Sequence, residues 1–272
     1  MGRRCVAILV IAVTLVACSD SAKPTVSSQS SSIALPPINI LVTNDDGVGA
    51  PGIDALVVAL QKEPDVKVTV VAPATNQSGS GSQTSPSVTG TDASTLSDYP
   101  ATAVDGFPAD AVDYAITNVL DSPPDLVMSG INAGQNLGPV LDLSGTVGAA
   151  RKAAQEGFPA IAISAGFGDT IDYASAAAFA ISWLREHRDT LVTTHRPPTE
   201  VANLNSPTCA SGAIRGLVEV TSDTTASGDD ALAVADCTST APQPSTDVAA
   251  FHDGFATLTE VPIEASVASA SS

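Results

Sequence analysis

The stretch Ile38-Asn39-Ile40-Leu41-Val42-Thr43-Asn44-Asp45-Asp46-Gly47 decides the fold that this sequence predicts. Its first five residues form an apolar run with the length and composition of a buried strand. A turn-rich segment follows, and apolar residues then recur at helical spacing, at Ile53, Leu56, Val57 and Leu60. A buried strand that leads into a helix is typical of the βαβ unit, so the stretch predicts a parallel sheet.

The same rhythm continues along the chain. Three further apolar runs predict buried strands, namely Val66–Val71, Leu126–Met128 and Ala160–Ile163, and an Ala-rich segment at 147–155 predicts a helix between the last two. Together they predict an α/β, Rossmann-like three-layer domain with a mostly parallel sheet. Residues 76–103 are rich in Ser, Thr and Gly without clear periodicity, which predicts a long loop beside the sheet.

The ends of the chain have a different composition. Residues 1–17 have a short basic start and an apolar run too short to span a bilayer, and Leu15-Val16-Ala17-Cys18 resembles a bacterial lipobox. We therefore expect a lipoprotein signal peptide at 1–17, lipid on Cys18, and export to the periplasmic or extracytoplasmic face of the cell membrane. An ordinary cleaved signal that contains a Cys is the alternative. Residues 18–36 predict a disordered tether, 37–190 the α/β core, and 191–272 a small β-rich C-terminal extension that completes the domain.

The net charge and the cysteine content limit the range of possible functions. The formal charge is −18, from 29 acidic and only 11 basic residues, which disfavours binding to a nucleic-acid polymer. A small phosphorylated substrate is compatible with this charge if a metal ion supplies positive charge. Because Cys5 leaves with the signal and Cys18 carries lipid, Cys209 and Cys237 remain as a possible disulfide in an oxidising compartment, or as two free thiols. Their spacing does not fit a zinc site.

Asp45 and Asp46 are the first candidate site. Two adjacent carboxylates after a buried strand are costly unless a cation or hydrogen bonds neutralise them. A solvated turn is the alternative, but ligands bind at the carboxyl ends of strands in such sheets, which favours a metal. Residues 47–52 also fit the G-x-G-x-x-G pattern of dinucleotide sites. We reject that interpretation, because the two carboxylates would face the pyrophosphate and the second strand ends without an acidic residue.

Three more polar loops follow predicted strands or open a helix, at 72–79, 129–138 and 144–147. Their glycines allow close backbone approach to a ligand, and the helix start at Ser144 is either an anion site or a simple N-cap. The four loops offer carboxylate, hydroxyl and amide oxygens without His or Cys, which suits Mg²⁺, Mn²⁺ or Ca²⁺ better than Zn²⁺. A hard cation beside an anion-binding helix start is the equipment for phosphoester hydrolysis.

Several motifs in this order resemble the SurE family of survival proteins, which are nucleotidases and phosphatases. They are residues 42–47, 50–53, 71–73 with 78–79, Gly106 with Pro108 and Asp110, 129–134 with 136–138, 144–147 and 157–160. The resemblance is dense over residues 38–165 and thinner at 203–207 and 254–259. It implies a Rossmann-like domain whose C-terminal part often exchanges between subunits, so a homodimer or tetramer is possible.

The resemblance also implies roles for individual residues. The implied metal ligands are Asp45, Asp46, Ser78 and Asn132, with Mg²⁺ or Mn²⁺ as the expected divalent metal. The implied catalytic set is Asn44, Asp45, Asp46 and Asn132. The implied phosphate-binding residues are Asn136, Ser144, Gly145 and Thr146, with Asn44 beside them. The chain departs from the family pattern at Gly49, Phe107, Val140 and Leu143, so we expect its substrate preference to differ. The segment 219–247 is shorter and more polar than the family's exchanged arm.

The expected function is therefore that of a metal-dependent phosphomonoester hydrolase, either a nucleoside monophosphate nucleotidase or a broad acid phosphatase, acting outside the cytoplasm. The alternative is a lipid-anchored solute-binding protein that uses the same cleft without turnover. A serine hydrolase is disfavoured because no G-x-S-x-G motif occurs. The histidines at 187, 195 and 252 also lie outside the four loops.

Overall fold

The apolar runs of the sequence form the inner strands of one sheet in the computed structural model of the protein, which describes residues 2, 36–194 and 196–265. The predicted lipidation site Cys18, and all of the predicted signal peptide except Gly2, lie outside the described residues. In chain order the strands are β1 (Ile38–Thr43), β2 (Val66–Pro73), β3 (Gly90–Ser94), β4 (Pro100–Val104), β5 (Leu126–Ala133), β6 (Ala160–Ala165), β7 (Glu200–Ser206), β8 (Leu217–Glu219) and β9 (Ala256–Pro262).

The sheet is mostly parallel. Within the described residues its nine strands have the order β3-β4-β2-β1-β5-β6-β7-β9-β8. Strands β4, β2, β1, β5, β6 and β7 all run parallel to their neighbours in this series, whereas β3 and β9 are antiparallel to β4 and β7. The predicted Rossmann-like α/β fold is confirmed. Because the parallel strands share one direction, the loops that follow β1, β2, β5 and β6 meet at one edge of the sheet.

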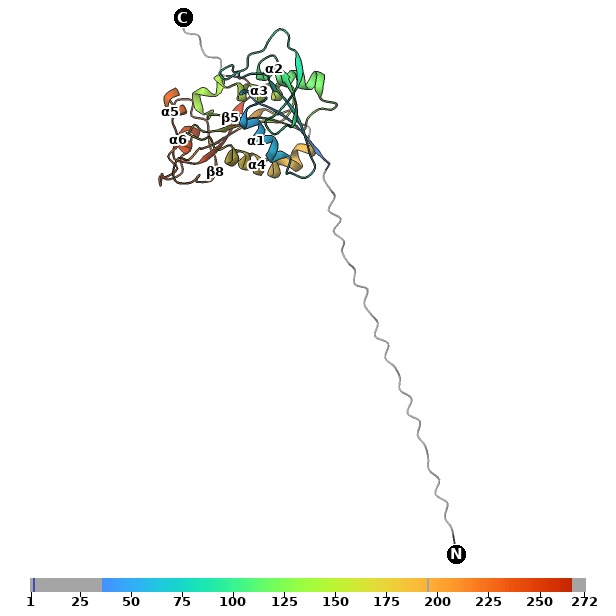
Figure 1. The fold of residues 1–272 in the computed structure, drawn as a ribbon. Helices are drawn as coiled ribbons and strands as arrows, with labels where there is room; N and C mark the ends of the chain where they lie inside the picture. The colour runs from blue at the N-terminus through green and yellow to red at the C-terminus, as the bar shows by residue number, and fades with distance from the viewer. Residues whose placement is uncertain (1, 3–35, 195, 266–272) are drawn as a thin grey trace. The chain divides into compact units, whose positions relative to one another are not determined.

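Helices cover both faces of the sheet. In chain order the helical segments are α1 (Pro51–Leu60), α2 (Pro108–Tyr114), the π-helical turn η1 (Ala115–Val119), the 3₁₀ turn η2 (Gly138–Leu143), α3 (Gly145–Gln155), α4 (Tyr173–Thr193), α5 (Gly228–Leu232) and α6 (Asp247–His252). Helices α1 and α4 pack together on one face, and α2 and α3 pack on the other (Figure 1). These are the three layers that the alternating sequence pattern predicts. None of the helices in the described part of the chain is long and apolar enough to cross a membrane.

Helix α1 packs closely against the end of β5, at the edge of the sheet where the loops meet. Its residues Ile53, Leu56, Val57 and Leu60 are fully buried, as their helical spacing predicts. At its start, a Cβ atom on Gly52 would collide with the Ile131 carbonyl oxygen in β5. Only glycine therefore allows the first turn of α1 to rest directly on the end of β5.

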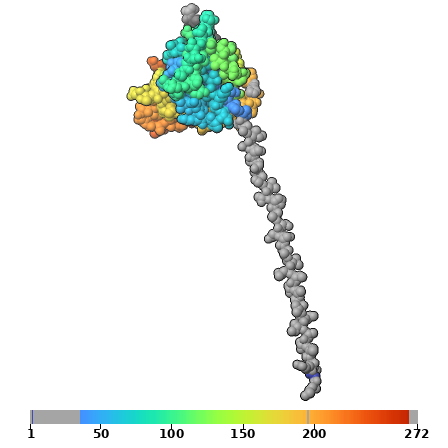
Figure 2. Space-filling view, turned by 45° about the vertical axis from the view of Figure 1, so that its right-hand side comes forward, coloured from blue at the N-terminus to red at the C-terminus, as the bar shows by residue number. Residues whose placement is uncertain are grey.

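The prediction of a long loop at residues 76–103 is wrong in its second half. Strands β3 and β4 form an antiparallel hairpin at one edge of the sheet. Most β3 side chains, and the first residue of β4, are exposed, so the hairpin lacks the apolar alternation by which a half-buried strand is recognised. The N-terminal part of the described chain, coloured blue to teal, makes up much of the face shown in Figure 2.

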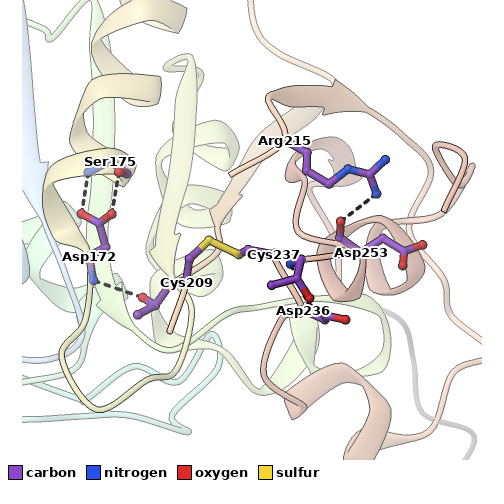
Figure 3. Close-up of a disulfide and its surroundings, with 9 residues drawn as sticks. Asp172, Ser175, Cys209, Arg215, Asp236, Cys237 and Asp253 are labelled. Atoms are coloured by element: carbon purple, nitrogen blue, oxygen red, sulfur yellow. Dashed lines mark hydrogen bonds between the residues drawn. A yellow bond between two sulfur atoms is a disulfide. The ribbon is translucent and has the colours of Figure 1, made fainter. Parts of the chain in front are cut away.

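The C-terminal segment joins the same sheet. Strands β7, β9 and β8 extend it beyond β6, and α5 and α6 pack beside η2 through a small apolar cluster that includes Leu137 and Phe251. A disulfide joins Cys209 to Cys237 across 28 positions of sequence, with the two Cα atoms 5.6 Å apart (Figure 3). Close by, the Arg215 guanidinium donates to the Asp253 carbonyl over 3.1 Å. The disulfide holds the segment that precedes α6, and the Arg215 bond holds Asp253, which follows it.

Candidate metal centre and phosphate site

The turn after β1 places two adjacent carboxylates at the edge of the sheet. Asn44 closes this turn, because its amide nitrogen donates to the Gly47 carbonyl over 2.9 Å and its side-chain oxygen accepts from the Gly47 amide over 3.2 Å. Gly47 has a φ of 102°, a conformation that residues with a side chain rarely adopt. Both polar ends of Asn44 are thus engaged inside the turn, and this residue acts by holding Asp45 and Asp46 in position.

Asp45 is almost completely buried and is bonded to the start of α3. Its Oδ1 accepts a 2.6 Å hydrogen bond from the Thr146 hydroxyl. Burial raises the pKa of Asp45 to about 6, since the Thr146 hydrogen bond opposes the cost of desolvation only in part and the neighbouring Asp46 adds repulsion. A cation beside this carboxylate would strongly stabilise its charged form.

Asp46 is held by two other loops. Its Oδ2 accepts from the Ala133 amide over 2.9 Å and its Oδ1 accepts from the Asn76 side chain over 3.0 Å. Burial raises the pKa of Asp46, while hydrogen bonds from Ala133, Asn76 and Ser78 oppose the rise. The Asn76 side-chain oxygen also accepts from the Ser78 amide over 2.9 Å, so Asn76 places Ser78 next to Asp46. Our sequence reasoning did not single out Asn76, because its role depends on a contact 30 residues away in the chain.

Asn132 lies at the end of β5, next to the residue whose amide binds Asp46. Its amide nitrogen donates to the Gly134 carbonyl over 2.6 Å, which leaves the side-chain oxygen without a hydrogen bond among the described residues. The next residue, Ala133, donates to Asp46. The structure therefore brings the loops that carry Asp45, Asp46, Ser78 and Asn132 into direct contact with each other.

The start of α3 lies against Asp45. Ser144 caps the helix, since its hydroxyl accepts from the Val147 amide over 3.1 Å. A Cβ atom on Gly145 would lie 3.0 Å from Asp45 Oδ2 and 2.9 Å from the Ser80 hydroxyl oxygen. That hydroxyl is buried and has no hydrogen-bond partner among the described residues. A buried polar atom without a partner, beside a carboxylate and a helix N-terminus, is typical of a position where a water or an ion completes the hydrogen bonding.

Asn136 is positioned by a network of buried asparagines. Its backbone amide donates to the Asn205 side chain over 2.7 Å, and its carbonyl accepts from Asn203 and Asn205 over 3.0 and 3.1 Å. Its side-chain nitrogen donates to the Ser164 hydroxyl over 2.9 Å. Two neighbouring strands, β6 and β7, thus hold Asn136, which the sequence predicts to bind phosphate. Asn203 and Asn205 were recognisable only as a faint motif in the sequence, and they were not among the predicted site residues.

Tyr173 is another residue that our sequence reasoning missed. It is the first residue of α4, and its ring lies 3.0 Å from the position that a Cβ atom on Gly52 would occupy. Burial and the charge of Asp46 both raise the pKa of Tyr173, which places the phenol beside that carboxylate. An aromatic residue at a helix start resembles any core residue in sequence, so no local pattern could reveal this contact.

The donor set fits a hard divalent cation. In the part of the chain that the structure describes, no group of three or more His, Cys, Asp or Glu side chains could hold a metal. The predicted centre reaches four donors only by adding the Ser78 hydroxyl and the Asn132 amide oxygen to the two carboxylates. An all-oxygen set of this kind matches the preferences of Mg²⁺, Mn²⁺ and Ca²⁺.

Most of the other singled-out residues lie apart from these loops. His187 is bonded to the Trp183 carbonyl and stacked on its ring, His252 is bonded to the Asp230 carbonyl, and His195 lies outside the described residues. Among the four departures from the family pattern, Leu143 directly precedes the α3 cap and is 63% exposed. It is the departure that lies next to the predicted phosphate-binding residue Ser144 in sequence.

Comparisons with known proteins agree with this arrangement. A family model described as "Survival protein SurE" matches residues 40–229, which include every loop of the site. The chain is 40% identical over 179 residues to the 5'-nucleotidase SurE of Methylococcus capsulatus, with 66% of this chain and 68% of that protein covered. Against the 5'-nucleotidase SurE of Carboxydothermus hydrogenoformans it is 41% identical over 191 residues, with 66% and 69% covered. The crystal structure of the SurE protein from Aquifex aeolicus superposes with a TM-score of 0.66 at 27% identity, covering 83% of this chain and 94% of that one.

Proposed function

Because the chain belongs to the survival protein SurE family, it is a metal-dependent phosphatase or nucleotidase, and we propose that its substrates are nucleoside monophosphates. The observation that carries the proposal is the contact between Asp45 and the start of α3. Through the Thr146 hydroxyl, the carboxylates of the predicted metal centre lie directly beside the helix end predicted to bind phosphate. This contact supports the proposal, because a phosphomonoester bound at one of the two predicted sites would lie beside the other.

We propose that a divalent metal, Mg²⁺ or Mn²⁺, is held by Asp45, Asp46, Ser78 and Asn132. Such a cation supplies Lewis acidity toward a phosphoryl oxygen and toward the attacking water. It also offsets the repulsion that a protein of charge −18 exerts on an anionic substrate.

The residues of the chain do the binding and the orienting. The N–H groups of Gly145 and Thr146 lie at the positive end of the α3 dipole, which favours negative charge on a phosphate bound there; the Thr146 N–H also interacts with the Asp45 carboxylate. Asn136, held by its asparagine network, offers its second amide hydrogen to the same group. Asn44 and Asn76 keep the two carboxylates aligned through hydrogen bonds that substrate binding does not need to break.

The test is release of phosphate from nucleoside 5'-monophosphates, with Mg²⁺ or Mn²⁺ and with chelator. We expect turnover that requires metal and that falls by about a hundredfold or more in Asp46→Asn, since even residues behind a metal ligand affect activity tenfold to a hundredfold. Asp189→Asn, at an exposed position of α4, is the matched control and should keep full activity. A folded protein that binds nucleotide but hydrolyses no phosphomonoester with any of these metals would instead be a solute-binding protein.

We also propose that the enzyme is exported and anchored by lipid on Cys18. The lipobox-like Leu15-Val16-Ala17-Cys18 and the polar segment after it support this. Mass spectrometry of the membrane fraction should find a chain that begins at an acylated Cys18, and Cys18→Ser should abolish the modification. Recovery of the uncut chain in the cytoplasm would overturn the proposal.

A further inference from the structure

Several exposed apolar residues lie on segments that are bonded to a loop of the proposed site. Six large apolar residues are exposed in the described part of the chain, namely Leu96, Leu143, Phe167, Leu217, Leu232 and Val234. Leu143 precedes the α3 cap, and the backbone of the segments that carry Phe167, Leu232 and Val234 is bonded to a loop of the site. Single exposed apolar residues are ordinary, but a group of them beside a functional site points to a ligand.

One buried side chain connects these segments. Gln135 is 2% exposed and lies between the predicted ligand Asn132 and the start of η2. Its Oε1 accepts from the Phe167 amide over 3.0 Å, and its Nε2 donates to the Ala231 and Ala233 carbonyls over 3.3 and 2.8 Å. Because an unpaired buried amide is costly, Gln135 holds both segments firmly to the site loop.

The Phe167 ring rests on that loop. A Cβ atom on Gly134 would lie 2.5 Å from the ring, so the ring occupies the space that glycine leaves open. The Gly134 carbonyl in turn accepts the hydrogen bond of Asn132. Phe167 nevertheless remains 39% exposed, although it follows β6 at the edge where the site lies.

The second segment is fixed from its other end as well. Leu232 and Val234 are 45% and 65% exposed, and three residues after Val234 the disulfide of Cys237 ties the chain to Cys209 (Figure 3). The segment that carries these two apolar residues is therefore fixed at both ends, by Gln135, which also binds the Phe167 amide, and by the disulfide. We call Phe167, Leu232 and Val234 the apolar rim.

We propose that the apolar rim binds the nucleobase of the substrate and selects nucleotides over small aliphatic phosphate esters. This inference rests on the proposed phosphatase function. It adds which part of the substrate, other than the phosphate, the protein binds. The face of a purine or pyrimidine is planar and apolar, and it stacks on an exposed aromatic ring whatever the base. Glycerol phosphate has no such group, so the apolar rim does not increase its binding affinity.

The test compares a nucleoside 5'-monophosphate with glycerol phosphate as substrates of the metal-loaded full chain. Base–aromatic stacking contributes about 1–3 kcal/mol, so Phe167→Ala should raise KM for the nucleotide about tenfold or more. It should leave KM for glycerol phosphate and both kcat values within about twofold. The specificity ratio is kcat/KM for the nucleotide divided by kcat/KM for glycerol phosphate. Phe167→Tyr should keep the wild-type ratio, and Leu232→Ser should lower it. Leu96→Ala, in the turn between β3 and β4, should not change it.

Equal losses on both substrates in Phe167→Ala would overturn the inference. So would a change in oligomeric state, measured by light scattering, that accounts for the loss, because the apolar rim would then be an interface between copies of the chain. Calorimetry with nucleotide separates the two proposals. Phe167-dependent binding without any turnover would refute the phosphatase and keep the apolar rim, whereas turnover with equal preference for both esters would do the reverse.

Discussion

Replacing Asp45 by Asn should make the metal-free protein more stable while it abolishes activity. Burial raises the pKa of this carboxyl from 3.8 to about 6. Between these two values the folded state holds the proton more tightly than the unfolded state, so the free energy of unfolding falls as pH rises through the window. A shift of about two pH units at about 1.4 kcal/mol per unit gives a cost of about 3 kcal/mol above pH 6. Asn has nearly the same shape, can still accept from Thr146, and carries no charge.

The measurement is urea unfolding in the presence of chelator, with the disulfide intact. At pH 7.5 we expect the free energy of unfolding of Asp45→Asn to exceed that of the wild type by about 3 kcal/mol, and at pH 5 by about half of that. Asp189→Asn, on exposed helix surface, should change little at either pH. Added Mg²⁺ or Mn²⁺ should stabilise the wild type and not the variant. A variant that is no more stable than the wild type at pH 7.5, or a difference that does not shrink toward pH 5, would refute this reasoning.

Three further predictions concern the C-terminal segment. Replacing Cys209 and Cys237 by Ser should lower the free energy of unfolding by about 3.5 kcal/mol, from the entropy of the loop that the disulfide closes; equal urea midpoints before and after replacement would contradict this. Partial desolvation and the nearby carboxylates of Glu200 and Glu219 raise the pKa of Glu260, although its side chain is exposed, so Glu260→Gln should be slightly more stable than the wild type at pH 7.5. That advantage should shrink as pH falls, and a pH-independent difference would exclude this cause. Asn205→Leu leaves the Asn136 amide without its acceptor and should cost roughly 2 kcal/mol in urea unfolding. The same variant should also lose phosphatase activity, and unchanged turnover would show that the network does not position Asn136.

The central sheet could be predicted from sequence because its strands are buried on both faces. Runs such as Ile38–Val42 and Ala160–Ile163 are almost uninterrupted in apolar residues, and both became parallel inner strands. The hairpin of β3 and β4 escaped prediction because most side chains of the edge strand β3 are exposed, and β4 is buried only at its last two residues. The β3 sequence, Gly90-Thr91-Asp92-Ala93-Ser94, carries the composition of a loop.

The candidate site divides in the same way. Asp45 and Asp46 stand out because two charged residues directly follow an apolar strand. Asn76, Ser80, Gln135 and Tyr173 do not stand out, because each matters through a contact with a distant part of the chain. Polar residues in Ser-rich loops are common, and their number gives no hint of which one faces a carboxylate.

The asparagine network at Asn136 bears on how this protein could be divided or recombined. Asn203 and Asn205 belong to β7, so the loop next to the proposed phosphate site takes its shape from a strand that starts at residue 200. A fragment that stops before β7 would keep every predicted ligand and lose the scaffold of that loop. Designers who wish to graft this chemistry onto another protein must therefore transplant the sheet through β7. New sequence is better inserted at exposed positions such as Ser211 or Thr240, which lie outside the strands.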